Sequence, residues 1–184
     1  MARISLDSII GQNGPNYSEA IAAPYREELV NSGFQQMLTP EEIDNVLDKN
    51  DDKVVLVVLN SVCGCSARVA RPGTLLSLFN NVVPDVLATT FAGMEKDAVA
   101  HFRTKYLPGL TPSSPNIALF KNGKLIHILH RYQIERSSAV EIADELINVY
   151  NDQCSHSNEG EEREKLREFF KAKYNVDPLN LPTE

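Results

Sequence analysis

The sequence predicts an α/β fold in which helices cover both faces of a central mixed β-sheet. Three observations lead to this prediction. The segment 53–60 contains an aliphatic run, 54–59, that is too uniform to alternate, as in a strand buried on both faces. Strand-like and helix-like segments then alternate along the chain. The strand-rich part finishes in a hairpin, which adds antiparallel strands to the sheet.

The composition is that of one globular domain. A chain of 184 residues can bury a large core, so we expect no structural disulfide to be needed. The hydrophobic share of 42% and the charged share of 23% are ordinary for a soluble protein. The net charge is −7 and no Lys/Arg cluster is visible, so neither nucleic acid nor a membrane surface is an expected partner.

The sequence predicts a cytoplasmic protein. Its first residues contain no basic segment followed by a sustained apolar stretch, so we expect no signal peptide. The longest aliphatic run, 54–59, is far too short to span a bilayer. In the cytoplasm thiols are kept reduced, and cysteines there more often carry redox or metal chemistry than brace a fold.

The chain divides into a domain with an N-terminal helical extension, 1–154, and a charged C-terminal tail, 155–184. The composition becomes polar after Cys154 and then turns amphipathic. A helix in this tail would align Leu166, Phe169, Phe170 and Tyr174 along one stripe. We expect that helix to dock on the domain or on a partner.

The N-terminal part is expected to be irregular over 1–16 and helical over 24–34. Pro24 suits the first turn of this helix, and Gly33 is a typical stop. A second helix follows at 38–49, where Thr39, Pro40 and Glu42 supply the cap, the first helical position and a capping box.

The helices and strands after residue 60 are predicted from the spacing of apolar residues and from turn residues. A helix is expected after the strand 53–60, with Pro72 and Gly73 kinking or interrupting it. A strand at 85–91, a helix at 95–107 and a hairpin at 116–130, turning at Asn122-Gly123, come next. The last helix of the domain, 137–154, is predicted to bury Val140, Ala143, Ile147 and Tyr150.

Cys63 and Cys65 follow the buried strand with only Gly64 between them. At the N-terminus of the next helix, free N–H groups and the helix dipole would stabilise a thiolate, and Arg68 and Arg71 could add positive potential. Gly64 permits the bend that a bridge between such close cysteines requires. We expect a strained, labile bridge, which suits an attacking thiol and a resolving neighbour.

Two other interpretations of the pair remain open. Both cysteines could be buried core residues. They could instead bind a metal together with Cys154 or a histidine, in a metal-binding or carrier protein. No second closely spaced Cys/His pair completes such a site, so we expect no metal.

The dipeptide Ser114-Pro115 stands directly before the hairpin. Proline is tolerated at the first residue of a strand. Beside a redox pair, this position suits a cis-proline loop that faces the thiols.

These segments, taken in order, resemble the bacilliredoxin family, which has the thioredoxin fold and a Cys-X-Cys site. The resemblance rests on SVCGCSARVARPG at 61–73, FAG at 91–93 and SSPNIALFKNGKLIHILHR at 113–131. It covers roughly residues 17–154, and the tail lies outside it. Val57 stands where thioredoxin keeps a buried acid, so proton transfer here would use another group or water.

The resemblance implies a thiol–disulfide oxidoreductase that removes bacillithiol, or a similar low-molecular-weight thiol, from mixed disulfides of client proteins. Cys63 would be the nucleophile, Cys65 the resolving thiol, and Ser114-Pro115 the loop that holds the client backbone. The small thiol would be a co-substrate, with no bound cofactor. Related members have been viewed as disulfide isomerases, so an isomerase or weak oxidant is the alternative enzyme.

Overall fold

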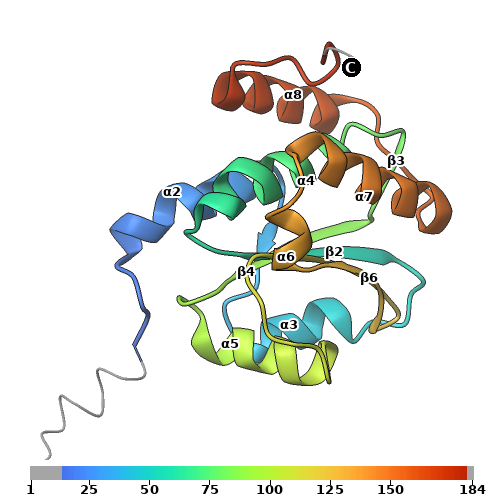
Figure 1. Cartoon of the computed structure of the whole chain (residues 1–184). Helices are drawn as coiled ribbons and strands as arrows, with labels where there is room; N and C mark the ends of the chain where they lie inside the picture. The colour runs from blue at the N-terminus through green and yellow to red at the C-terminus, as the bar shows by residue number, and fades with distance from the viewer. Residues whose placement is uncertain (1–13, 182–184) are drawn as a thin grey trace, which may run out of the picture.

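The computed structural model describes residues 14–181 (Figure 1). The predicted irregular segment 1–16 therefore lies mostly outside the described residues. A five-stranded mixed sheet forms the centre, in the order β1-β4-β2-β5-β6. Its strands are β1 (Gln35–Gln36), β2 (Val54–Asn60), β4 (Val86–Phe91), β5 (Asn116–Lys121) and β6 (Lys124–Leu129).

The sheet has the thioredoxin-like topology that the sequence led us to expect. Strands β1, β4 and β2 run parallel, β5 pairs antiparallel with β2, and β6 pairs antiparallel with β5. Asn122 and Gly123 both have positive φ, as a tight two-residue hairpin turn requires. Strand β2 is buried along its whole length, which explains its uninterrupted aliphatic sequence.

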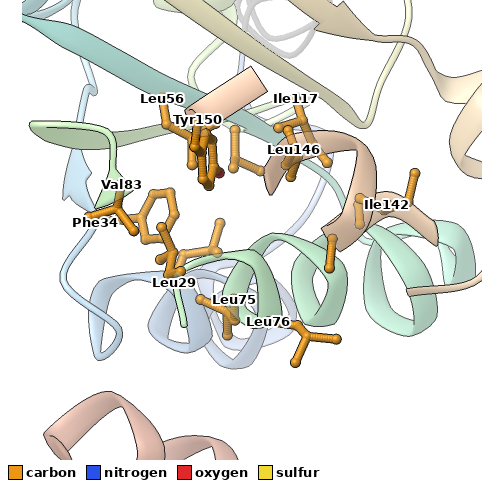
Figure 2. Close-up of a cluster of buried hydrophobic side chains, with 14 of the residues drawn as sticks. Leu29, Phe34, Leu56, Leu75, Leu76, Val83, Ile117, Ile142, Leu146 and Tyr150 are labelled. Carbon is orange, nitrogen blue, oxygen red and sulfur yellow. The ribbon is translucent and has the colours of Figure 1, made fainter. Parts of the chain in front are cut away.

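Helices cover both faces of the sheet, and the core accordingly has two parts. One part packs α2 (Glu19–Val30), α4 (Arg71–Ser77) and α7 (Ala139–Gln153) against alternate residues of β2 (Figure 2). The other part packs α3 (Pro40–Leu47) and α5 (Lys96–His101) against the opposite face. A short helix, α6 (Arg131–Ile134), follows the hairpin.

The helix after the cysteines is not interrupted at Pro72 and Gly73, although interruption was one of the two outcomes that the sequence predicted. A π-helical turn, Ser66–Ala70, leads directly into α4. Proline lacks an N–H, and the wider turn before it lets the helix continue without the usual bond. Gly73 has a packing role instead. An added Cβ would lie 2.8 Å from the carbonyl oxygen of Ala139, so glycine allows α4 and α7 to approach closely.

Two other helix predictions need correction. Helix α2 begins at Glu19 after Ser18, so Pro24 lies inside the helix rather than in its first turn. In α7, Val140 is 48% exposed, whereas Ile142 and Leu146 are buried with Ala143 and Tyr150. The α7 face that contacts α4 is thus rotated relative to the predicted one.

The C-terminal tail docks on the domain. The sequence had left two possibilities open, the domain itself or a partner. Strand β7 (His156–Ser157) pairs with β3 (Val82–Val83), and α8 (Glu161–Tyr174) packs beside α4 and α7 (Figure 1). The rings of Phe170 and Phe79 pack edge to face, with 5.9 Å between their centroids. The Arg163 guanidinium donates to the Phe79 carbonyl oxygen at 2.7 Å. Over residues 14–181, none of the helices is both long and apolar enough to cross a membrane.

Candidate functional site

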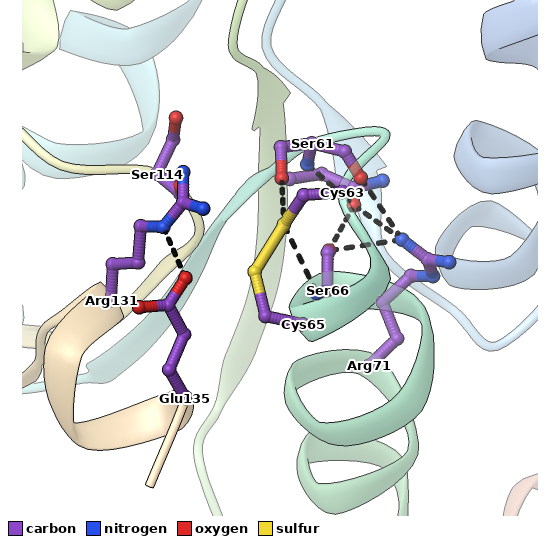
Figure 3. The surroundings of a disulfide bond; sticks show 9 residues. Ser61, Cys63, Cys65, Ser66, Arg71, Ser114, Arg131 and Glu135 are labelled. Carbon is purple, nitrogen blue, oxygen red and sulfur yellow. Dashed lines mark hydrogen bonds and ion pairs between the residues drawn. A yellow bond between two sulfur atoms is a disulfide. The ribbon is translucent and has the colours of Figure 1, made fainter.

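Cys63 and Cys65 form a disulfide in the turn that leads from β2 into the following helix (Figure 3). Their Cα atoms are 5.4 Å apart, within the usual range for bridged cysteines. Gly64 between them is exposed, and both cysteines are partly exposed. Neither cysteine is therefore fully buried, although Cys65 packs against the edge of the core.

Cys63 receives two hydrogen bonds on its sulfur. The Ser66 backbone N–H donates to Sγ at 3.3 Å, and the Ser61 hydroxyl donates to it at 3.1 Å. The first helical residue is Gly64, so the sulfur stands at the start of the helix. Donors and a positive dipole end that face a sulfur favour its ionised form. The geometry thus favours Cys63 as the thiol that ionises.

The two arginines proposed from the sequence occupy different places. Arg68 is exposed, and its guanidinium lies beside Gly64, 3.3 Å from where a Cβ would stand. Arg71 is only 1% exposed and lies beneath the turn. Its Nη1 donates to Ser66 Oγ at 2.9 Å and to the Ser61 carbonyl oxygen at 3.2 Å. Arg71 therefore contacts the buried side of the cysteine turn, where its hydrogen bonds hold the turn in place.

Asn60, at the end of β2, organises the same turn and was missed from the sequence. Its Oδ1 accepts from the Ser61 N–H at 2.9 Å, from the Ser66 hydroxyl at 3.0 Å and from Arg71 at 3.0 Å. Its Nδ2 donates to the Tyr25 carbonyl oxygen at 2.8 Å. A polar residue that ends an all-aliphatic strand was the available signal, because a buried amide must find partners.

The Ser114–Pro115 peptide bond is cis, and Pro115 is buried directly before β5. The first residue of β5, Asn116, pairs with Leu59 near the end of β2. This register brings the proline loop beside the cysteine turn. Figure 3 shows Ser114 opposite the disulfide, on the side away from the helix.

A charged pair formed by Arg131 of α6 and Glu135, the residue after α6, also faces the disulfide (Figure 3). No sequence pattern pointed to this pair. Arg131 donates through Nη1 to the Ser114 carbonyl oxygen at 3.4 Å. Its Nε forms an ion pair with Glu135 at 2.7 Å. Arg131 is the cation on the proline-loop side of the site, as Arg68 is on the helix side.

The third cysteine does not join the site. Cys154 is half-buried at the end of α7, and burial raises the pKa of its thiol to about 12. Its thiol therefore stays protonated at neutral pH. Between residues 14 and 181, no group of three or more His, Cys, Asp or Glu side chains is arranged to hold a metal ion.

Known proteins share this chain's sequence over most of its length. Residues 17–154 match the family described as disulphide isomerase. A bacilliredoxin of Halalkalibacterium halodurans is 42% identical over 139 residues, which cover 76% of this chain and 95% of that protein. A bacilliredoxin of Cytophaga hutchinsonii is 44% identical over 136 residues, covering 74% and 98%.

This chain is also similar, at lower sequence identity, to a solved structure. The oxidised thioredoxin of Plasmodium falciparum is 17% identical with a TM-score of 0.43, covering 64% of this chain and 97% of that one. A bacilliredoxin of Staphylococcus aureus adds a third relative, 38% identical over 138 residues, which cover 75% of this chain and 93% of that protein. Because the matches span three quarters of the chain and nearly the whole of each relative, this chain belongs to the bacilliredoxin family of thiol–disulfide oxidoreductases.

Proposed function

We propose that this protein removes bacillithiol, or a similar low-molecular-weight thiol, from mixed disulfides of client proteins. One observation carries the proposal: two donors point at Cys63 Sγ at a helix start, with a second cysteine within bridging distance. The names of the relatives support the choice of thiol.

The reaction is a sequence of two thiol–disulfide exchanges. The Cys63 thiolate attacks the bacillithiol sulfur, so that the client leaves as a thiolate and takes a proton from water. A disulfide now joins Cys63 to bacillithiol. The Cys65 thiolate then attacks Cys63 Sγ, bacillithiol leaves, and the bridge seen in the structure forms. A thiol reductant, either one dithiol or two monothiol molecules, must return two electrons to this bridge before the next turnover, and is itself oxidised to a disulfide.

The groups around the disulfide fit these steps. Ser114, which is partly exposed directly before Pro115, would offer its backbone to an extended client segment beside the thiols. Arg131, which is paired with Glu135, would help to hold the proline loop through its bond to the Ser114 carbonyl oxygen. Arg68 supplies positive charge on the side of the cysteine turn.

The test uses a model protein that carries bacillithiol as a mixed disulfide, with its mass followed after the reduced enzyme is added. We expect Cys63→Ser to release no bacillithiol. Cys65→Ser should accumulate one bacillithiol on Cys63, which added free bacillithiol then releases. Cys154→Ser serves as the matched control and should behave as the unchanged protein. Full release by Cys63→Ser would refute the assignment.

Disulfide isomerisation is the second candidate, favoured by the description of the matching family. In that case the Cys63 thiolate would attack a protein disulfide, and the client's own thiol would resolve the adduct. Recovery of activity by scrambled ribonuclease, with no bacillithiol present, distinguishes this function. Isomerisation should survive Cys65→Ser, since the client thiol can replace Cys65 as the resolving group.

A further inference from the structure

The tail helix α8 reaches the polar groups beneath the redox site. Near its C-terminal end, the Tyr174 hydroxyl donates to Oε1 of Glu28, a residue of α2. The other carboxylate oxygen, Oε2, forms an ion pair with Arg71 Nε at 3.0 Å. Glu28 is 5% exposed and Arg71 is 1% exposed. A continuous polar path, buried at Glu28 and Arg71, therefore runs from α8 to the arginine under the cysteine turn.

The path continues from Arg71 to the sulfur. The Nη1 atom of Arg71 donates to Ser66 Oγ at 2.9 Å and to Asn60 Oδ1 at 3.0 Å. The backbone N–H of Ser66 donates in turn to Cys63 Sγ at 3.3 Å. The orientation of the Arg71 guanidinium thus fixes the residue that bonds the sulfur.

The tail contributes a hydrogen-bond donor to this path in addition to its packing contacts. The Tyr174 ring already packs on Phe170 at 4.6 Å, and a phenylalanine would make the same contact. The hydroxyl is an additional group, and it meets a buried carboxylate that would be costly without donors. Lys173 Nζ lies 3.8 Å from the same Glu28 oxygen that pairs with Arg71. Burial and the bond to Glu28 raise the pKa of Tyr174, so its hydroxyl remains a donor.

We infer that α8 is part of the redox site, and that Tyr174 is a positioning residue that sets the reactivity of Cys63 through Glu28 and Arg71. The inference rests on the proposed function, in which Cys63 is the attacking thiol. It assigns a role to a segment that lies beyond the matched family region, 17–154.

The sign of the effect follows from the charges. Without the Tyr174 donor, more of the carboxylate's negative charge acts on Arg71. The guanidinium is drawn toward Glu28 and away from the oxygens under the turn, and its positive potential at the sulfur falls. The Cys63 thiolate loses stabilisation, so its pKa rises. The other charged groups at the site, Arg68 on the helix side and the Arg131–Glu135 pair on the opposite side, are unchanged by this substitution.

The test measures how the alkylation of Cys63 by iodoacetamide depends on pH, in full-length reduced protein carrying Cys65→Ser. Tyr174→Phe should raise the kinetic pKa by ~0.5 unit, which leaves about threefold less thiolate at a pH well below the pKa. Glu28→Gln removes the negative charge and should shift the kinetic pKa in the opposite direction. If Glu28→Gln does not fold, the Tyr174→Phe result decides alone.

Tyr150→Phe is the matched control. It removes a buried hydroxyl that bonds Ser77 at 3.0 Å within the same part of the core, away from the path to Cys63. It should lower stability without moving the kinetic pKa. Equal kinetic pKa values in Tyr174→Phe and Tyr150→Phe would overturn the inference. Alkylation needs no bacillithiol, so this outcome is distinct from a failure to release bacillithiol, which would refute only the proposed function.

Discussion

Replacing Gly73 by alanine sets two effects of opposite sign against each other. Alanine favours a helix interior by ~1 kcal/mol over glycine. The added Cβ, however, would lie 2.8 Å from the Ala139 carbonyl oxygen and 2.9 Å from Cβ and Cγ2 of Ile142. A backbone oxygen cannot move aside as the end of a flexible side chain can, so α4 and α7 must separate.

The structure indicates that the clash outweighs the gain in propensity. Overpacking a core costs about 1–3 kcal/mol, and three contacts this short place Gly73→Ala near the upper end. Subtracting the gain in helix propensity leaves a loss of about 2 kcal/mol in the free energy of unfolding. At about 2–4 °C per kcal/mol for a domain of this size, Tm should fall by about 4–8 °C.

Thermal unfolding followed by circular dichroism measures this change, and urea unfolding checks it at constant temperature. Gly64→Ala is the control at the other end of the same helix. Its Cβ would meet only the Arg68 guanidinium, at 3.3 Å, and that group can move. Its stability should be unchanged or slightly higher. A Tm for Gly73→Ala equal to or above that of the unchanged protein would refute the packing argument and favour a helix-breaking role for this glycine.

Three further predictions concern buried or paired charges. Arg71→Met removes the buried cation 3.0 Å from the Glu28 carboxylate and leaves only Lys173, at 3.8 Å, so it should lower the free energy of unfolding by about 3–5 kcal/mol in urea titrations; an unchanged midpoint would contradict it. Arg167 lowers the pKa of Asp177 to about 2, so the stabilisation from this pair is complete above the ordinary carboxyl pKa and is lost as the pH falls toward 2. A carboxyl titration by NMR should find that pKa low, and near its ordinary value in Arg167→Gln. Cys154 should resist iodoacetamide at pH 8 in the folded reduced protein and react in urea, because its pKa is about 12 when buried; rapid native labelling, seen by mass spectrometry, would argue against that burial.

Local patterns were enough to predict the elements that carry the site. The aliphatic run of β2, the Asn122-Gly123 turn and the Cys63/Cys65 pair each act through neighbouring residues, so a short window of sequence contains the signal. The alternation of strands and helices that ends in a hairpin followed from the same windows, whereas the thioredoxin fold was implied by the resemblance to the bacilliredoxin family. Predictions of which side chains face a neighbouring helix or strand were less accurate. Val140 and Gly73 were both misjudged, because each outcome depends on the contact between α4 and α7.

The sequence by itself determined that a closely spaced pair of cysteines follows a buried strand and that a proline loop precedes a hairpin. Backbone sterics, turn geometry and cysteine spacing are short-range properties, and they survive in any window of the chain. The tertiary structure alone decided that Arg71 lies under the turn instead of beside the thiols, and that Tyr174 reaches Glu28 across 146 positions of sequence. These are matters of burial and of charge in a low-dielectric interior, and both exist only once distant helices pack together.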